Sequence, residues 1–109
     1  MPRIVRPTRA PKESSVEKFF VEETTKLGLE CRKYKTRTHD PDRLILGPNR
    51  LIIFVELKRP KAGAIGAGTR PRPGQVREHQ RLHDMGFPVY VLSSRQEVET
   101  FIEMLKAVI

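Results

Sequence analysis

Glu56 and Lys58 are the residues whose types and spacing most clearly suggest chemistry, and they follow the apolar run 51–55. This run is rich in β-branched residues, which is typical of a strand buried on both faces. Side chains alternate along a strand, so Glu56 and Lys58 are expected to share one face. Unpaired charge is costly away from water, so the two form either an ion pair at the strand end or part of a reactive site. For an isolated Glu-x-Lys sequence the ion pair is the favoured interpretation.

Asp42 is the second candidate, because a hairpin turn expected at Gly47–Asn49 would bring it beside Glu56. Two carboxylates held a few ångströms apart repel each other by about 4 kcal/mol at an intermediate dielectric constant. A divalent cation relieves this repulsion, and hard oxygen ligands suit Mg²⁺ or Mn²⁺. On its own Asp42 would be interpreted as a turn or strand-start residue. Together with Glu56 and Lys58 it indicates a metal site at one end of a sheet.

Hydrophobic periodicity and turn residues predict the elements that hold these side chains. Helices are expected at about 14–27, 74–84 and 94–108, and strands at 29–36, 42–46, 51–58 and 88–92. The first three strands have short connections and predict an antiparallel meander, whereas strand, helix and strand after residue 51 predict a right-handed parallel crossover. The fold class is therefore α/β, with a four-stranded mixed sheet flanked by helices in the order α-β-β-β-α-β-α.

The composition narrows the function classes. The chain has 109 residues, with 21 Lys and Arg against 13 Asp and Glu, and its net charge is +8. The length favours one domain, at 13–109, preceded by a flexible basic arm at 1–12, and the positive charge favours a polyanionic binding partner. One cysteine, Cys31, excludes an internal disulfide and is most simply a small buried hydrophobic residue in a reducing compartment. No apolar run is long enough to span a membrane and no signal-peptide core is present, so a soluble protein is expected.

Taken in order, the motifs resemble the PD-(D/E)xK nuclease superfamily, whose restriction-endonuclease-like core has the same α-β-β-β-α-β order. They are most similar to the VRR-NUC family, including its small stand-alone bacteriophage members. The resemblance covers most of residues 13–105, and its signature consists of Glu17, Pro41-Asp42-Arg43, Val55-Glu56-Leu57-Lys58-Arg59-Pro60, Gln75 and Gly86-Phe87-Pro88-Val89. The ordered set is far more specific than any single Glu-x-Lys.

The resemblance implies a role for each residue at the strand end. Asp42 and Glu56 would ligate Mg²⁺ or Mn²⁺, with the Leu57 carbonyl oxygen as a further ligand. Lys58 would orient or polarise the attacking water and stabilise the charge that develops on the phosphorus centre.

Two further site residues and one departure follow from the same resemblance. Glu17 would face the metal directly or through water, with Glu13 as the lesser candidate, although Glu17 also fits a helix capping box. Gln75 would touch the water or Lys58, and otherwise is a polar residue at a helix start. The family usually has Gly shortly before its Pro-Asp, whereas this chain has His39-Asp40, which makes Asp40 a possible extra site carboxylate.

Basic side chains could line a phosphate track beside such a site. Their generic interpretation is solvated charge, but the net charge of +8 strengthens the functional one, and backbone and shape recognition is expected. The DNA-binding candidates are Lys33, Lys35, Arg37, Arg59, Lys61, Arg70, Arg72 and Arg77, with Arg81 nearby.

The spacing of His79 and His83 suggests a rival zinc site, because residues four apart share a helix face. Gln80 stands where a metalloprotease needs its glutamate base, and no third ligand is evident. The favoured interpretation is that the two histidines are exposed or face DNA.

The sequence therefore predicts a Mg²⁺- or Mn²⁺-dependent DNA endonuclease. Stand-alone members of the family resemble Holliday-junction resolvases in acting as homodimers. The resemblance therefore implies a homodimer that cuts flaps or junctions. A phage-encoded member would act in the cytoplasm of the bacterial host. The alternative is a non-catalytic nucleic-acid-binding module that kept the fold. A restriction-type enzyme is disfavoured because no recognition subdomain is present.

Overall fold

The computed structural model describes residues 15–58 and 72–109. The predicted basic arm and most of the loop after residue 58 lie outside the described residues, as do Glu13, Arg59, Lys61 and Arg70. The elements are α1 (Ser15–Lys26), β1 (Glu30–Lys33), β2 (Arg43–Gly47), β3 (Leu51–Leu57), α2 (Pro73–Asp84), β4 (Val89–Leu92) and α3 (Arg95–Val108). This is the predicted element order.

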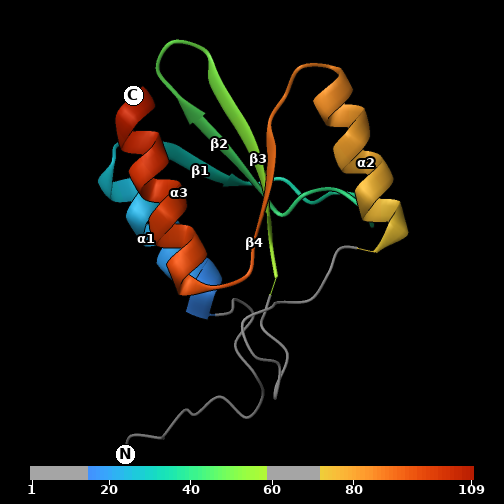
Figure 1. The fold of residues 1–109 in the computed structure, drawn as a ribbon, viewed down its shortest axis with the longest axis horizontal. Helices are drawn as coiled ribbons and strands as arrows, with labels where there is room; N and C mark the ends of the chain where they lie inside the picture. The colour runs from blue at the N-terminus through green and yellow to red at the C-terminus, as the bar shows by residue number, and fades with distance from the viewer. Residues whose placement is uncertain (1–14, 59–71) are drawn as a thin grey trace, which may run out of the picture.

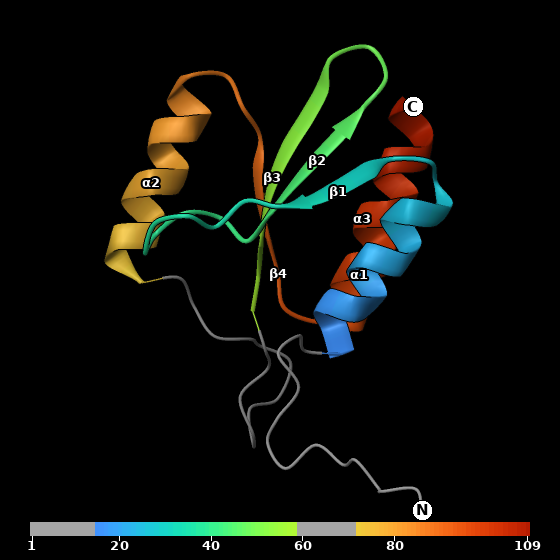
Figure 2. The ribbon, with the colours of Figure 1, turned by 180° about the vertical axis from the view of Figure 1, so that it is seen from behind.

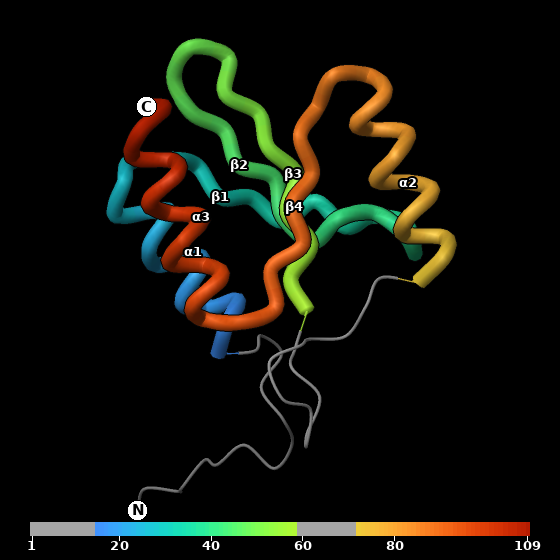
Figure 3. Tube along the Cα trace, viewed as in Figure 1, coloured from blue at the N-terminus to red at the C-terminus, as the bar shows by residue number. Residues whose placement is uncertain are grey.

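One four-stranded sheet runs through the centre of the fold in the order β1-β2-β3-β4 (Figure 1). β1, β2 and β3 are antiparallel neighbours, and β4 lies parallel to β3 after the α2 connection (Figure 3). The predicted mixed sheet is confirmed. β3 lies between two strands and carries the buried residues 53–56, which explains its almost continuous apolar sequence.

Helices cover both sides of this sheet. α1 and α3 pack together on one side, and α2 lies on the other (Figures 1 and 2). The core between the α1–α3 pair and the sheet contains the fully buried side chains of Phe20, Ile45, Val55, Val98 and Leu105. Within residues 15–58 and 72–109, no helix is both long and apolar enough to cross a membrane.

The β2–β3 turn fixes the register that aligns the site. Asn49 and Arg50 have φ angles of 58° and 62°, and Leu51 N–H donates to the Pro48 carbonyl oxygen at 3.2 Å. Two consecutive residues in the left-handed region match the twist of an antiparallel hairpin. The turn therefore lies one residue later than predicted, but the strands pair as expected.

Two elements differ from the sequence prediction. β1 ends at Lys33 rather than Thr36, because the Asp40 side chain accepts the backbone N–H groups of Thr36 and Arg37 and draws them into a loop. α2 lacks a continuous apolar inner face, because Val76 and the C-cap residue Met85 are 53% and 52% exposed. The buried residues of α2 are Gln75 and Leu82, so part of its inner face is polar.

Candidate active site

The hairpin register brings Asp42 next to Glu56. Arg43 pairs with Val55, so the preceding Asp42 lies opposite Glu56 at the end of the ladder. The Leu57 N–H donates a hydrogen bond of 2.8 Å to Asp42 Oδ2, which ties the segment before β2 to the end of β3. Asp42 and Glu56 face the side of the sheet opposite Val55, away from the α1–α3 core.

Lys58, Glu56 and Gln75 form a closed cluster next to this contact. Lys58 Nζ lies 3.0 Å from Glu56 Oε2 and donates to Gln75 Oε1 at 2.8 Å. Gln75 Nε2 donates to Glu56 Oε2 at 2.7 Å, and the Arg72 N–H donates to Gln75 Oε1 at 3.0 Å. Gln75 therefore fixes both charged side chains from the first turn of α2. The ion pair that the spacing favoured is present, but it belongs to a larger polar network.

Burial perturbs Glu56 strongly. Its side chain is 2% exposed, and this burial raises its pKa, as does the nearby Asp42 charge; Lys58 acts in the opposite direction. Glu56 Oε1 is buried and has no hydrogen-bond partner. A buried carboxylate oxygen without a partner, next to a second carboxylate, is an unfavourable arrangement that an added cation would relieve.

The oxygen donors here fit a hard divalent cation. They are the free Glu56 Oε1, the carboxylate of Asp42, and the backbone carbonyl group of Leu57 at the end of β3. Within the described ranges, no three His, Cys, Asp or Glu side chains gather as a metal-binding group. Such a site would therefore rest on two carboxylates and on oxygens that are not acidic side chains.

Comparisons with known proteins give the family of this chain. A search against protein-family models found no match. The chain is 43% identical over 89 residues to "Putative nuclease p44" of Acyrthosiphon pisum secondary endosymbiont phage 1, and the match covers 80% of this chain and 88% of that protein. A solved structure described as a VRR_NUC domain superposes with a TM-score of 0.71 at 38% identity, and it covers 86% of this chain and 97% of that one. The chain belongs to the VRR-NUC nuclease family.

This VRR-NUC chain places Glu17 at a different contact from Asp42 and Glu56. Glu17 Oε2 accepts from Arg43 Nε at 2.9 Å, and the two side chains are 19% and 6% exposed. Arg43 pairs with Val55 in the ladder and so projects from the face opposite Glu56. The buried Arg43 was not assigned a role from the sequence, although its alternation with the core residue Ile45 points to the core face. A metal-binding role of Glu17, directly or through water, stays a prediction.

Asp40 organises the loop before the site. It is 1% exposed and accepts from the Thr36 hydroxyl at 2.9 Å and from Arg37 Nη2 at 3.0 Å, besides two backbone N–H groups. Burial alone would raise the pKa of Asp40, but the bonds from Arg37 and Thr36 outweigh it and lower the pKa. Arg37 also reaches Glu78 on α2 at 3.3 Å. In this VRR-NUC chain Asp40 therefore holds its own loop against α2 and does not join the Asp42 cluster.

The predicted DNA-binding residues that the structure describes differ in where they lie relative to this site. Lys35 Nζ lies 3.9 Å from Asp42 Oδ1, which brings a second lysine to the site. Arg72 and Arg77 are exposed at the start and middle of α2, whereas Lys33 pairs with Arg43 in the ladder and lies on the opposite face. Arg59, Lys61 and Arg70 lie outside the described residues.

The histidines of α2 differ from each other. His83 is exposed, as predicted, but His79 is not: it is half-buried and its Nε2 atom is fully buried without a partner. From the sequence, His79 was compared only with His83, but His79 also lies four residues after Gln75 and so shares a helix face with it. Cys31 is partly buried against the core.

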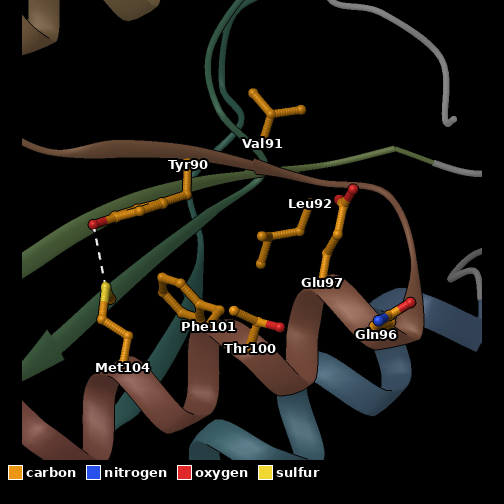
Figure 4. A pocket seen from close by; sticks show the side chains of 8 residues that line it. All are labelled: Tyr90, Val91, Leu92, Gln96, Glu97, Thr100, Phe101 and Met104. Carbon is orange, nitrogen blue, oxygen red and sulfur yellow. Dashed lines mark hydrogen bonds between the residues drawn. The ribbon is translucent and has the colours of Figure 1, made fainter.

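A pocket of about 370 Å³ lies away from this cluster, between β4 and α3 (Figure 4). It is lined mainly by apolar side chains such as Tyr90, Phe101 and Met104, and the Tyr90 hydroxyl lies 3.3 Å from Met104 Sδ. Tyr90 and Phe101 also contact each other edge to face, with ring centroids 5.1 Å apart. Glu97 is the only carboxylate among the residues that line the pocket, and its Oε1 atom accepts hydrogen bonds from the Ser93 N–H and hydroxyl groups. The pocket therefore lacks the two neighbouring carboxylates and the lysine that meet at the end of β3.

Proposed function

We propose that this protein is a Mg²⁺- or Mn²⁺-dependent DNA endonuclease that hydrolyses phosphodiester bonds at the Asp42–Glu56–Lys58–Gln75 cluster. The observation that carries the proposal is the environment of Lys58. Its ammonium group is held by Glu56 Oε2 and Gln75 Oε1 at 3.0 Å and 2.8 Å, and the Glu56 carboxylate is in turn repelled by the nearby Asp42 charge. An ordinary structural ion pair needs neither the second carboxylate nor the unpaired Glu56 oxygen.

Asp42, Glu56 and the Leu57 carbonyl oxygen would hold the metal ion. A bound Mg²⁺ or Mn²⁺ supplies Lewis-acid stabilisation of negative charge on phosphate oxygens and favours deprotonation of water. The bond from the Leu57 N–H to Asp42 Oδ2 holds the two strands together and fixes how Asp42 is presented. Burial of Glu56 strengthens its attraction for a cation, because charges interact more strongly where water is excluded.

Lys58 and Gln75 would act on the water and on the phosphate. A fixed ammonium group is suited to orient the attacking water and to stabilise the negative charge that builds up on the phosphate. Gln75 uses both ends of its amide, accepting from Lys58 and donating to Glu56, so it sets the position of both side chains. Positioning groups of this kind contribute by reducing the reorganisation that the reaction requires.

DNA is proposed as the substrate because the chain carries a net charge of +8 and has exposed basic residues beside the site. Lys35, Arg72 and Arg77 support contacts to the phosphate backbone. We further propose that the protein acts as a homodimer on flapped or four-way-junction DNA, since so small a domain offers a limited surface for gripping a branched substrate. Two copies would provide two basic faces.

The test is a cleavage assay on linear duplex, flap and four-way-junction DNA with Mg²⁺, Mn²⁺ or EDTA, for wild type and Lys58→Ala. Cleavage that needs the metal and Lys58, and is fastest on a branched substrate, is expected. Cleavage in EDTA would refute the metal dependence. If the protein bound DNA but no substrate were cut under any condition, it would be a non-catalytic binding module. Light scattering at several concentrations tests the dimer, and a persistent 12.6 kDa species would refute it.

A further inference from the structure

Within the described part of the chain, two buried side-chain polar atoms lack a hydrogen-bond partner: Glu56 Oε1 and His79 Nε2. The proposed metal site accounts for the Glu56 atom. The His79 atom has no role in the chemistry above. A polar atom that is buried without a partner is unfavourable, and an apolar side chain of similar size would avoid this cost. His79 therefore calls for an explanation other than packing.

The position of His79 points toward the active-site cluster. It lies on α2 four residues after Gln75 and three before Leu82, so the three side chains share one helix face. Gln75 and Leu82 are buried on this face, and Gln75 bonds to both Glu56 and Lys58. The imidazole of His79 is therefore one helical turn beyond the residue that organises the site.

Charges from several elements surround the His79 imidazole. Burial lowers its pKa, and Lys58 at the end of β3 lowers it further, as does Lys35 from the segment after β1. Glu78 on α2 and Asp42 before β2 act in the opposite direction without reversing the shift. The ring is therefore neutral near neutral pH, and it lies within the electrostatic field of both lysines of the site.

We propose that His79 is a further substrate-binding residue, whose Nε2–H donates a hydrogen bond to a non-bridging oxygen of the phosphodiester that Lys58 faces. The proposal rests on the proposed nuclease function. Lys58 and Lys35 attract an anionic oxygen to this part of the site, and a neutral imidazole has one N–H group to donate. A phosphate oxygen would satisfy the buried Nε2 atom with a charge-assisted bond.

Two substitutions separate this polar role from packing. His79→Leu removes the nitrogen, whereas His79→Gln keeps an amide N–H donor at similar reach. We expect His79→Leu to melt at or above the wild-type temperature, because an unpaired polar atom is lost, and to lower kcat/KM about tenfold or more. His79→Gln should stay within about threefold of wild type. His83→Leu, at an exposed position on the same helix, is the matched control and should cleave as wild type does.

A wild-type rate for His79→Leu would overturn the proposal. So would an equal loss in the Leu and Gln variants together with lower melting temperatures, because both would then reflect a packing defect. Binding gives a second readout that does not depend on cleavage: the fluorescence anisotropy of labelled flap DNA with Ca²⁺ in place of Mg²⁺. His79→Leu should raise Kd about threefold without changing its salt dependence, since the ring is neutral, whereas Lys35→Gln should reduce the slope by about one.

This binding experiment also separates the two proposals. If wild type cleaves no substrate, the nuclease function fails, but the effect of His79→Leu on Kd still decides whether His79 meets a phosphate. An unchanged Kd for His79→Leu would overturn the inference in either case.

Discussion

Replacing Asp42 with Asn or with Ala separates the charge of this side chain from its structural hydrogen bond. Asp42 Oδ2 accepts the Leu57 N–H at 2.8 Å, and an Asn carbonyl oxygen can accept the same bond. The Asp42 charge also raises the pKa of Glu56, after the larger contribution of burial. Asn therefore keeps the contact between the strands and removes the repulsion, whereas Ala removes both.

The expected sizes follow from these contacts. Without metal, the free energy of unfolding of Asp42→Asn should stay within about 0.5 kcal/mol of wild type, as for most substitutions that keep their contacts. Asp42→Ala should lower it by about 1.5 kcal/mol, because it loses a hydrogen bond to a charged acceptor that is 23% exposed. Mg²⁺ at ten times its Kd should stabilise wild type by about 1.4 kcal/mol, and neither variant should gain this amount.

The assay is urea unfolding followed by circular dichroism, in EDTA and in Mg²⁺, together with single-turnover DNA cleavage. Asp42→Asn should fold like wild type, gain little stability from Mg²⁺, and cleave at least about 100-fold more slowly. The reasoning would be refuted if Mg²⁺ stabilised Asp42→Asn as much as wild type, or if that variant cleaved at the wild-type rate.

Three further predictions concern Gln75 and Glu56 in the cluster and Asp40 in the loop before it. Gln75→Leu should slow cleavage by about 10- to 100-fold, because Lys58 loses its 2.8 Å acceptor; a wild-type rate for a folded variant would contradict this role. The raised pKa of Glu56 means that its favourable contribution to stability exists below its unfolded pKa near 4.5 and is lost as the pH rises through the folded value. The free energy of unfolding of metal-free Glu56→Gln, measured by urea titration at several pH values, should not show this loss. If the variant kept the pH profile of wild type, Glu56 would not be the cause. The lowered pKa of Asp40 has the opposite effect: its contribution to stability is present above its unfolded pKa near 3.8 and is lost as the pH falls through the folded value. Asp40→Asn should therefore lower the free energy of unfolding by about 1–3 kcal/mol at neutral pH and by less in acid; the same loss at every pH would rule out the charge as its cause.

The sheet and its register could be predicted because they depend on local signals. The apolar run of β3, the turn before it and the alternation of residues along β2 together place Asp42 beside Glu56. The turn lies one residue later than predicted. The register of β2 and β3 is nevertheless as expected, because it is set by which side chains of the two strands face the core. The relation of Gln75 to Lys58 followed from the family resemblance and not from periodicity.

The parts that could not be predicted involve contacts between distant residues. The bond between Glu17 and Arg43 joins residues 26 positions apart, and no pattern in either segment specifies the other. The polar inner face of α2 was missed because periodicity finds helices by their apolar stripe, whereas this helix turns Gln75 toward the site and leaves Val76 exposed. His79 was compared with His83 alone, since burial of a single nitrogen cannot be recognised without the fold.

The rate of DNA cleavage in Mg²⁺, measured for wild type, Lys58→Ala and Lys106→Ala, tests the central claim most directly. Lys106 is an exposed lysine on α3 paired with Glu103, so its loss controls for the removal of one positive charge. Wild type and Lys106→Ala should cleave at similar rates and stop cleaving in EDTA, while Lys58→Ala should be at least about 100-fold slower. Cleavage that persists in EDTA, or in folded Lys58→Ala at the wild-type rate, would contradict the assignment of this cluster as a metal-dependent nuclease site.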